Sequence, residues 1–163
     1  MSEYEPADEP IPQKLEKAIK QARLLEHQDD DYDYVVRYPQ FFQLADDSLM
    51  DKGACRFTFA QDCLEVVLSA FVEPDAGSLS IQQASNKYAA DLHATHQRLG
   101  PDYFILSGAL RSDTGRIAGR RFHAKFVRHR KFWFVQSLTY PEDCEQALQR
   151  LLREIDTWQV WKN

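Results

Sequence analysis

Residues 102–141, DYFILSGALRSDTGRIAGRRFHAKFVRHRKFWFVQSLTYP, decide the fold of this chain. Tyr103 opens a short apolar, aromatic and β-branched run, which is typical of a strand buried on both faces. Apolar and other residues alternate around Arg121–Phe126, and a second aromatic run begins at Phe132 and continues to Tyr140. The turn cluster 112–115 and a second short turn leave only tight connections between these segments. The stretch therefore predicts three consecutive antiparallel strands.

The register of the last two strands depends on where the second turn lies. A two-residue turn at His129-Arg130 would place Phe126 opposite Trp133. The same turn would place Ala124 opposite Val135, and we take this register as the expectation. Such cross-strand pairs each contribute roughly 0.2–1 kcal/mol.

Working towards the N-terminus, the pattern predicts further strands and one helix. Residues 1–11 are acidic and proline-containing, which is typical of a disordered tail. Apolar residues then recur at three-to-four spacing, which predicts an amphipathic helix over residues 12–27. Residues 32–38 read as a strand, and Cys55–Ala60 with Cys63–Val72 read as a hairpin.

Two more helices are expected in the second half of the chain. Ser80 and Gln83 have the spacing of a capping box, which predicts a helix over 81–99 that ends at Gly100-Pro101. Pro141 opens a C-terminal helix over 141–159. The expected fold is one α+β domain over 12–163, with an antiparallel sheet of about six strands within 32–140, covered by amphipathic helices.

Length and composition restrict the class of protein. The chain has 163 residues and a formal net charge of −5, and its 44% hydrophobic content is enough to build a core. No apolar run approaches the roughly 20 residues needed to span a bilayer, and the N-terminus lacks the pattern of a signal peptide. We expect a cytoplasmic protein as the sequence stands, or an exported periplasmic lipoprotein if an N-terminal signal has been removed.

The three cysteines do not have the spacing of metal ligands. An odd number leaves at least one of Cys55, Cys63 and Cys144 without a disulfide partner, which favours a reducing compartment. We interpret them as small, partly buried apolar residues.

Charge is distributed unevenly along the chain. Residues 1–33 carry ten acidic and four basic side chains, whereas residues 111–131 carry eight basic and one acidic. The basic segment is the best candidate for a binding surface, and the candidate residues are Arg116, Arg120, Arg121, Lys125, Arg128, Arg130, Lys131 and Trp133. Two other interpretations stay open: a charged edge strand that resists aggregation, or a partner for the protein's own acidic segment.

Catalytic and metal-binding motifs are absent from the sequence. His93 and His96 would lie one helical turn apart, but a metal site needs a third ligand at a set spacing. Ser107-Gly108 lacks the flanking pattern of a nucleophile elbow, and Cys144 has no identifiable His or Asn partner. We predict no catalytic residue, no metal and no cofactor.

Residues 32–160 resemble the PsbP/Mog-type superfamily, particularly its bacterial DcrB-like and uncharacterised lipoprotein branches. The resemblance rests on the hairpin before the helix, the helix itself, the string FILSG at Phe104–Gly108 and the string SLTYP at Ser137–Pro141, followed by a terminal helix. It implies an accessory or adaptor protein, because members bind partner proteins such as a small GTPase or a photosystem. It carries over no binding residue.

The functional expectation is a non-enzymatic domain that binds another, unidentified protein through the basic strand pair 116–131. The alternatives are an enzyme of unknown reaction, or a binder of anionic lipid or nucleic acid. The net charge of −5 opposes binding of the whole molecule to a nucleic acid.

Overall fold

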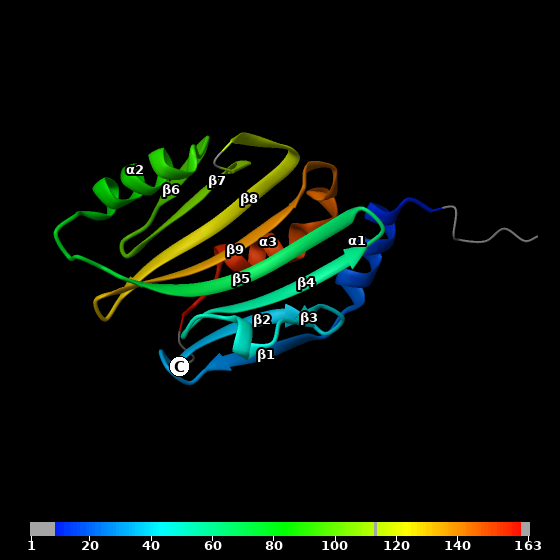
Figure 1. Ribbon diagram of the computed structural model, residues 1–163, viewed down its shortest axis with the longest axis horizontal. Helices are drawn as coiled ribbons and strands as arrows, with labels where there is room; N and C mark the ends of the chain where they lie inside the picture. Colours follow the sequence, from blue (N-terminus) through cyan, green and yellow to red (C-terminus); the bar gives the residue numbers. More distant parts are fainter. Residues whose placement is uncertain (1–8, 113, 161–163) are drawn as a thin grey trace, which may run out of the picture.

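A computed structural model shows a large antiparallel sheet with helices packed against both faces (Figure 1). The structure describes residues 9–112 and 114–160. The helices are α1 (Ile11–Gln21), α2 (Ile81–Leu92) and α3 (Gln149–Asp156), with short 3-10 turns at Asp47–Leu49, Glu142–Cys144 and Gln146–Leu148. The strands are β1 (Leu24–Asp29), β2 (Tyr34–Pro39), β3 (Gln43–Leu44), β4 (Cys55–Gln61), β5 (Leu64–Pro74), β6 (His96–Leu99), β7 (Tyr103–Ser112), β8 (Gly115–His129) and β9 (Phe132–Pro141).

The main sheet has seven strands in the order β3-β4-β5-β9-β8-β7-β6, and every neighbouring pair is antiparallel. The α+β class expected from the sequence is confirmed. The strand predicted at 32–38 does not join this sheet, because β2 pairs with β1 in a separate two-stranded ribbon. This ribbon packs on the same face of the sheet as α1 and α3.

The three strands predicted from residues 102–141 are present as β9, the central strand of the sheet, followed by β8 and β7. The predicted register of β8 and β9 is wrong by two residues. Phe126 pairs with Val135, and Trp133 pairs with Arg128. The turn lies one residue later than expected, at Arg130 and Lys131, which have φ of 54° and 69°. Positive φ at both turn residues matches the right-handed twist of the strands.

The helix predicted over 12–27 is too long. α1 ends at Gln21, Ala22 is extended, and the next residues pair with β2 as strand β1. Arg150, which is distant in sequence, caps the C-terminus of α1. Its Nη1 donates hydrogen bonds to the carbonyls of Ile19 (2.5 Å) and Ala22 (2.9 Å). The tail predicted over 1–11 lies mostly outside the described residues. Ile11 already belongs to α1.

The helix predicted over 81–99 is also too long. The capping box of Ser80 and Gln83 is present, but α2 ends at Leu92 and His93 takes a left-handed conformation with φ 56°. The chain then turns back as β6 and pairs with β7. Gly108 allows this close approach, because a Cβ there would lie 3.1 Å from the backbone nitrogen of Thr95.

The C-terminal helix predicted over 141–159 is interrupted. Two 3-10 turns precede α3, which begins only at Gln149. Their period of three residues per turn brings Cys144 and Ala147 to the same buried side. After α3 the chain is extended, because Trp158 Nε1 donates to the carbonyl of Val35 (2.7 Å) and Val35 N donates to the carbonyl of Val160 (3.0 Å).

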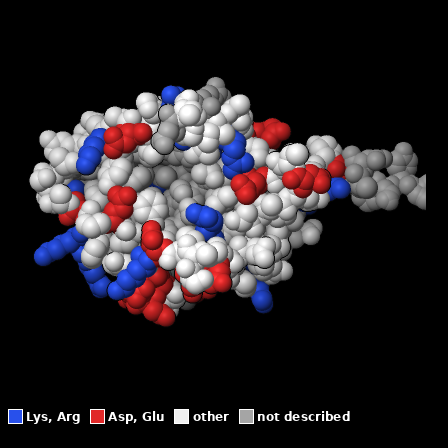
Figure 2. Space-filling view, viewed as in Figure 1, with Lys and Arg blue, Asp and Glu red and all other residues white. Residues whose placement is uncertain are grey.

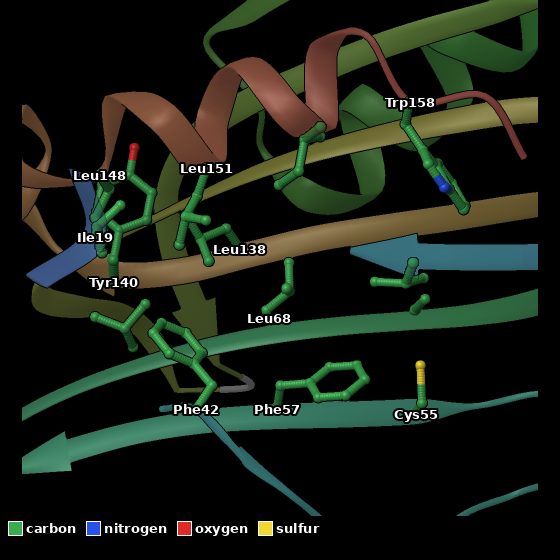
Figure 3. Packing of buried hydrophobic residues seen from close by; sticks show 14 of the residues in the cluster. Ile19, Phe42, Cys55, Phe57, Leu68, Leu138, Tyr140, Leu148, Leu151 and Trp158 are labelled. Atoms are coloured by element: carbon green, nitrogen blue, oxygen red, sulfur yellow. The ribbon is translucent and has the colours of Figure 1, made fainter. Parts of the chain in front are cut away.

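The larger core lies between the main sheet and the layer of α1, α3 and the β1–β2 ribbon (Figure 3). Ile19, Leu148 and Leu151 come from the helical layer and meet Leu138 and Tyr140 of β9. All five are nearly inaccessible to solvent. The two ends of the chain are therefore held together by apolar contact across the same sheet face.

The smaller core lies on the other face, beneath α2. Its residues are Ala84 and Ala89 of α2, with aromatic and aliphatic side chains of β7, β8 and β9. α2 has 12 residues and covers the part of this face formed by Phe104, Phe126 and Trp133. The part formed by β5 and the adjoining half of β9 has side chains that are only half-buried, including Val67 and Ser69.

We expect the three free thiols to differ sharply in reactivity towards Ellman's reagent. Cys55 and Cys144 are buried, and burial raises the pKa of each thiol to about 11, whereas Cys63 is exposed in the turn between β4 and β5. In the native protein one thiol should react rapidly with the reagent, and in denaturant all three should react. The variant Cys63→Ser should lose the rapid phase, and a rapid reaction of two or more native thiols would contradict the packing described here.

Candidate binding site

The basic segment predicted as a binding surface is divided between the two faces of the sheet. Side chains alternate along β8, so Arg120 and Arg128 lie on the α2 face, whereas Arg121 and Lys125 lie on the α3 face. Arg116 belongs to β8, but its side chain lies outside the description. The structure therefore does not bring these residues together as one patch.

Lys125 is an internal side chain that holds the end of α3. It is 5% exposed, and its Nζ donates to the carbonyls of Asp156 and Trp158, each at 3.0 Å. The ammonium also lies 4.4 Å from the centre of the Tyr103 ring. Burial lowers the pKa of Lys125, and the charges of Asp156 and Asp102 oppose that shift. These contacts use the ammonium within the protein, and they explain why a basic residue occupies a buried strand position.

Arg128 is also committed to partners within the chain. Its Nε lies 2.6 Å from Asp75 Oδ2, and its Nη2 donates to the carbonyl of Leu79 (2.8 Å). The guanidinium stacks 4.6 Å above the ring of Trp133. Trp133 itself is 3% exposed and makes edge contacts with Phe104 and Tyr88. Trp133 is therefore a core residue rather than an exposed binding residue.

The other arginines near the start of β8 also have internal partners. Arg120 Nη1 donates to the carbonyl of Glu65 (2.9 Å), and Arg121 Nε lies 3.4 Å from Glu145 Oε1. Arg130 and Lys131 are exposed in the β8–β9 turn.

The exposed basic turn lies beside the acidic turn between β1 and β2. The rings of Tyr32 and Phe132 meet at 5.2 Å and join these two turns. Figure 2 shows Lys and Arg side chains next to Asp and Glu side chains at this end of the molecule. The acidic residues Asp30, Asp31 and Asp33 thus place negative charge close to the remaining basic residues. This arrangement reduces the positive potential that the turn offers to a partner.

A cavity of about 670 Å³ opens on the α2 face, beside the helix. Figure 2 shows the hollow between α2 and the end of the β7–β8 hairpin. Its lining comes from β5, α2, β7, β8 and β9: Phe71, Glu73, Tyr88, Asp91, Leu92, His93, Leu110, Arg111, Ser112, Phe122, Ala124, Phe126, Val135, Ser137 and Thr139. The volume lies within the range of about 300–1,000 Å³ that is usual for ligand sites.

The floor of the cavity changes character along the strands. Phe71 of β5, Val135 of β9 and Phe126 of β8 lie opposite one another at one level of the sheet and form an apolar floor. Two residues further along β9, Ser137 Oγ lies 3.0 Å from Ser69 Oγ, and Thr139 continues the polar stripe. The cavity therefore offers apolar area together with a small number of hydroxyl groups.

The wall of the cavity carries carboxylates. Tyr88 of α2 donates its hydroxyl to Glu73 Oε2 of β5 at 2.7 Å. Burial and the negative charge of Glu73 raise the pKa of Tyr88, with smaller effects from Asp75 and Asp91. The raised pKa of the Tyr88 hydroxyl lies further from neutral pH than that of an ordinary tyrosine, so this hydroxyl is not tuned to act as an acid or base near pH 7.

The histidines predicted to be helical neighbours are separated by the end of α2. His93 caps the helix and lines the cavity, whereas His96 belongs to β6. In the parts of the chain that the structure describes, no group of three His, Cys, Asp or Glu side chains could hold a metal ion. No helix within these parts is long and apolar enough to cross a membrane.

The fold has known counterparts. No family model and no curated protein sequence matches the chain. Cyanobacterial PsbP from Synechocystis is 14% identical with a TM-score of 0.59, covering 86% of this chain and 94% of that one. The Ran-binding protein Mog1p of Saccharomyces cerevisiae is 12% identical with a TM-score of 0.61, covering 86% and 96%. The protein of unknown function PA94 from Pseudomonas aeruginosa is 12% identical with a TM-score of 0.51, covering 86% and 99%.

The chain has a PsbP/Mog-like fold. This confirms the resemblance drawn from the strings FILSG and SLTYP as far as the fold is concerned. The lipoprotein branch stays a prediction. At 12–14% identity the likeness shows the arrangement of strands and helices and assigns no binding residue.

Sequence reasoning missed the residues that line the cavity. One signal was available, because Ser137 and Thr139 put two polar side chains on the strand face that also carries Trp133 and Val135. Such a polar stripe on a central strand indicates a face that is not fully covered. The participation of Glu73 and Tyr88 had no comparable signal, since their contact joins residues of two different elements.

Proposed function

We propose that this protein is a non-enzymatic accessory or adaptor domain that binds another protein at the cavity beside α2. The observation that carries the proposal is the open cavity of about 670 Å³, which combines an apolar floor with a charged wall. Two proteins of the same fold, cyanobacterial PsbP and the Ran-binding protein Mog1p, support a binding role.

The surroundings of the cavity suit a protein partner better than a small molecule alone. Val67 and Ser69 of β5 continue the half-buried sheet surface beyond the cavity, and Leu92 at its rim is 38% exposed. A partner could place apolar side chains in the cavity and rest on this surface around it. Stable protein interfaces bury about 800 Å² on each partner, more than a cavity alone provides.

The basic strand pair 116–131 contributes to this proposal only through its exposed members. Arg130 and Lys131 lie in a turn next to the acidic β1–β2 turn, while Lys125 and Arg128 are held by internal partners. We propose this turn as a peripheral contact for acidic groups of a partner, subordinate to the cavity. Its acidic neighbours weigh against an anionic lipid or nucleic acid as the main target.

Site-specific photocrosslinking tests the proposal. A photoreactive amino acid at Leu92 should give discrete crosslinked products in the native host, because this residue lies at the rim of the cavity. The matched control is Leu49, which is 81% exposed in the 3-10 turn before β4. Adding Thr139→Trp should fill the cavity and remove the Leu92 products. Identical products from both positions, or products that survive Thr139→Trp, would contradict binding at the cavity.

A further inference from the structure

The chemistry of the cavity wall indicates what kind of residue the partner inserts. Glu73 is half-buried at the end of the apolar floor, and one of its oxygens accepts the Tyr88 hydroxyl at 2.7 Å. Its other oxygen, Oε1, makes no hydrogen bond within the described part of the chain. Tyr88 thus holds the carboxylate in place, and the carboxylate keeps further acceptor capacity at the cavity wall.

Asp91 adds a second negative charge on the same wall. It follows Tyr88 by three residues, about one helical turn, and its charge contributes to the raised pKa of Tyr88. Among the described residues, no Lys or Arg forms an ion pair with either Glu73 or Asp91. The nearby cation on α2 is Lys87, whose Nζ lies 5.9 Å from the centre of the Tyr88 ring.

Aromatic rings surround these carboxylates. The rings of Tyr88 and Phe126 lie 4.7 Å apart and are tilted by 39°, and Phe71 completes the aromatic lining at the same level of the sheet. Ring faces attract cations, and a desolvated cation gains more from them than an exposed one. A carboxylate held against aromatic rings therefore favours a Lys or Arg side chain over an acidic one.

The basic residue of the lining lies at the opposite end of the cavity. Glu73 is at the level of Trp133 and Arg128, whereas Arg111 lies beyond the level of Arg121. These levels are seven residues apart along β8, which corresponds to roughly 23 Å of strand. Arg111 is thus too distant to neutralise Glu73, because this separation is about three Debye lengths at physiological salt.

We propose that the cavity recognises a segment of the partner protein in which a Lys or Arg lies two residues from a Leu or Phe. This inference rests on the proposed function and specifies the partner's chemistry. The cation meets Glu73 and Asp91, and the apolar side chain covers Phe71, Val135 and Phe126. In an extended segment, residues two apart point to the same side and are separated by about 6.6 Å.

Short blocked peptides test the charge preference. The probes are Ac-Gly-Lys-Ser-Phe-Gly-amide, the same peptide with Glu in place of Lys, and the same peptide with Ser in place of Phe. Dissociation constants would be measured from amide chemical shifts of the cavity residues at 50 mM and 500 mM salt. At low salt the Lys-Phe peptide should bind about fivefold more tightly than the Glu peptide, which is the upper end of the range for one partly exposed ion pair. It should also bind at least about fivefold more tightly than the Ser peptide, because that peptide keeps the Lys but loses the apolar area of the Phe ring.

Matched variants assign the effect to Glu73. Glu73→Gln keeps the acceptor for Tyr88 and removes the charge, so the preference for Lys over Glu should fall below twofold. Glu65→Gln removes a carboxylate from the same face of β5, eight residues away and outside the lining, and should keep the preference. Ser137→Trp, two residues along β9 from Val135, should abolish binding of the Lys-Phe peptide, whereas Thr58→Trp, on the same sheet face but outside the lining, should not.

The outcomes separate this inference from the proposed function. Equal binding of the Lys and Glu peptides at the cavity, or tighter binding of the Glu peptide, would overturn the cationic preference and leave a cavity that still binds apolar segments. Absence of any shift at the cavity residues with millimolar peptide would also overturn the inference. The Leu92 crosslinking experiment decides the proposed function independently.

Discussion

Replacing Trp133 by alanine should lower the free energy of unfolding by about 3–5 kcal/mol. The side chain is 3% exposed, its ring makes edge contacts with Phe104 (5.2 Å) and Tyr88 (6.3 Å), and the guanidinium of Arg128 covers one face. The substitution leaves a large cavity beneath α2, where neighbouring backbone cannot collapse easily because it belongs to paired strands. Urea unfolding followed by circular dichroism measures the change.

A surface position serves as the control for this measurement. Leu49→Ala removes an apolar side chain that is 81% exposed, and it should change the free energy of unfolding by less than about 0.5 kcal/mol. A loss below 1 kcal/mol for Trp133→Ala would mean that Trp133 does not belong to the core, and would return it to the group of candidate binding residues.

Replacing Asp75 by alanine is expected to cost about 2–3 kcal/mol, somewhat less than the loss of one partner of a fully buried ion pair. Asp75 is 7% exposed at its side chain and bonds Arg128 Nε at 2.6 Å, while the Arg128 side chain is 27% exposed. Without the carboxylate, the partly buried guanidinium keeps only the Leu79 carbonyl and the Trp133 ring as partners. Thermal and urea unfolding both report the loss.

A double-mutant cycle isolates the ion pair from other effects. Asp75 Oδ1 also accepts from the backbone nitrogen of Gly77 (2.9 Å), so the single variant removes more than one bond. Arg128→Met keeps much of the side-chain volume and removes the charge. The coupling energy between the two substitutions should be at least about 1 kcal/mol. A coupling within 0.3 kcal/mol of zero, an effect as small as typical experimental scatter, would show that the pair is not a stabilising contact.

Local sequence patterns predicted the central strands and the start of α2 well. The alternation around Phe126 and the turn residues near Gly115 specify strands, because the side-chain period of a strand is local. The capping box of Ser80 and Gln83 is likewise formed by residues three apart. The two-residue error in the β8–β9 register preserved the face assignment of every side chain, because two residues is one full period of a strand.

The lengths of the helices were predicted poorly for a common physical reason. Leu25 and Leu99 continue the helical spacing of the segments before them, yet both belong to strands. Their backbone groups gain partners in β2 and β7, and Arg150 satisfies the last carbonyls of α1. Spacing alone cannot distinguish these outcomes, since the competing partners are distant in sequence.

The candidate site shows the same division between local and distant information. Seven basic residues between Arg116 and Lys131 are evident from the sequence, and strand alternation already implies that they cannot all share one face. Which of them are used internally depends on partners that are distant in sequence. Arg128 pairs with Asp75, 53 residues away, and Lys125 bonds the carbonyl of Asp156, 31 residues away. Arg121 pairs with Glu145, 24 residues away. The sequence alone does not show which distant residues form these pairs.

By itself the sequence determined the α+β class, the three central antiparallel strands and the capped start of α2, because each follows from residue spacing over a few positions. Tertiary structure alone decided the cavity. Its floor and wall come from β5, α2, β7, β8 and β9, and the contact of Tyr88 with Glu73 exists only when α2 packs on the sheet. The residues of a site assembled by long-range packing are close in space but have no regular spacing in the sequence, so no periodic pattern reveals them.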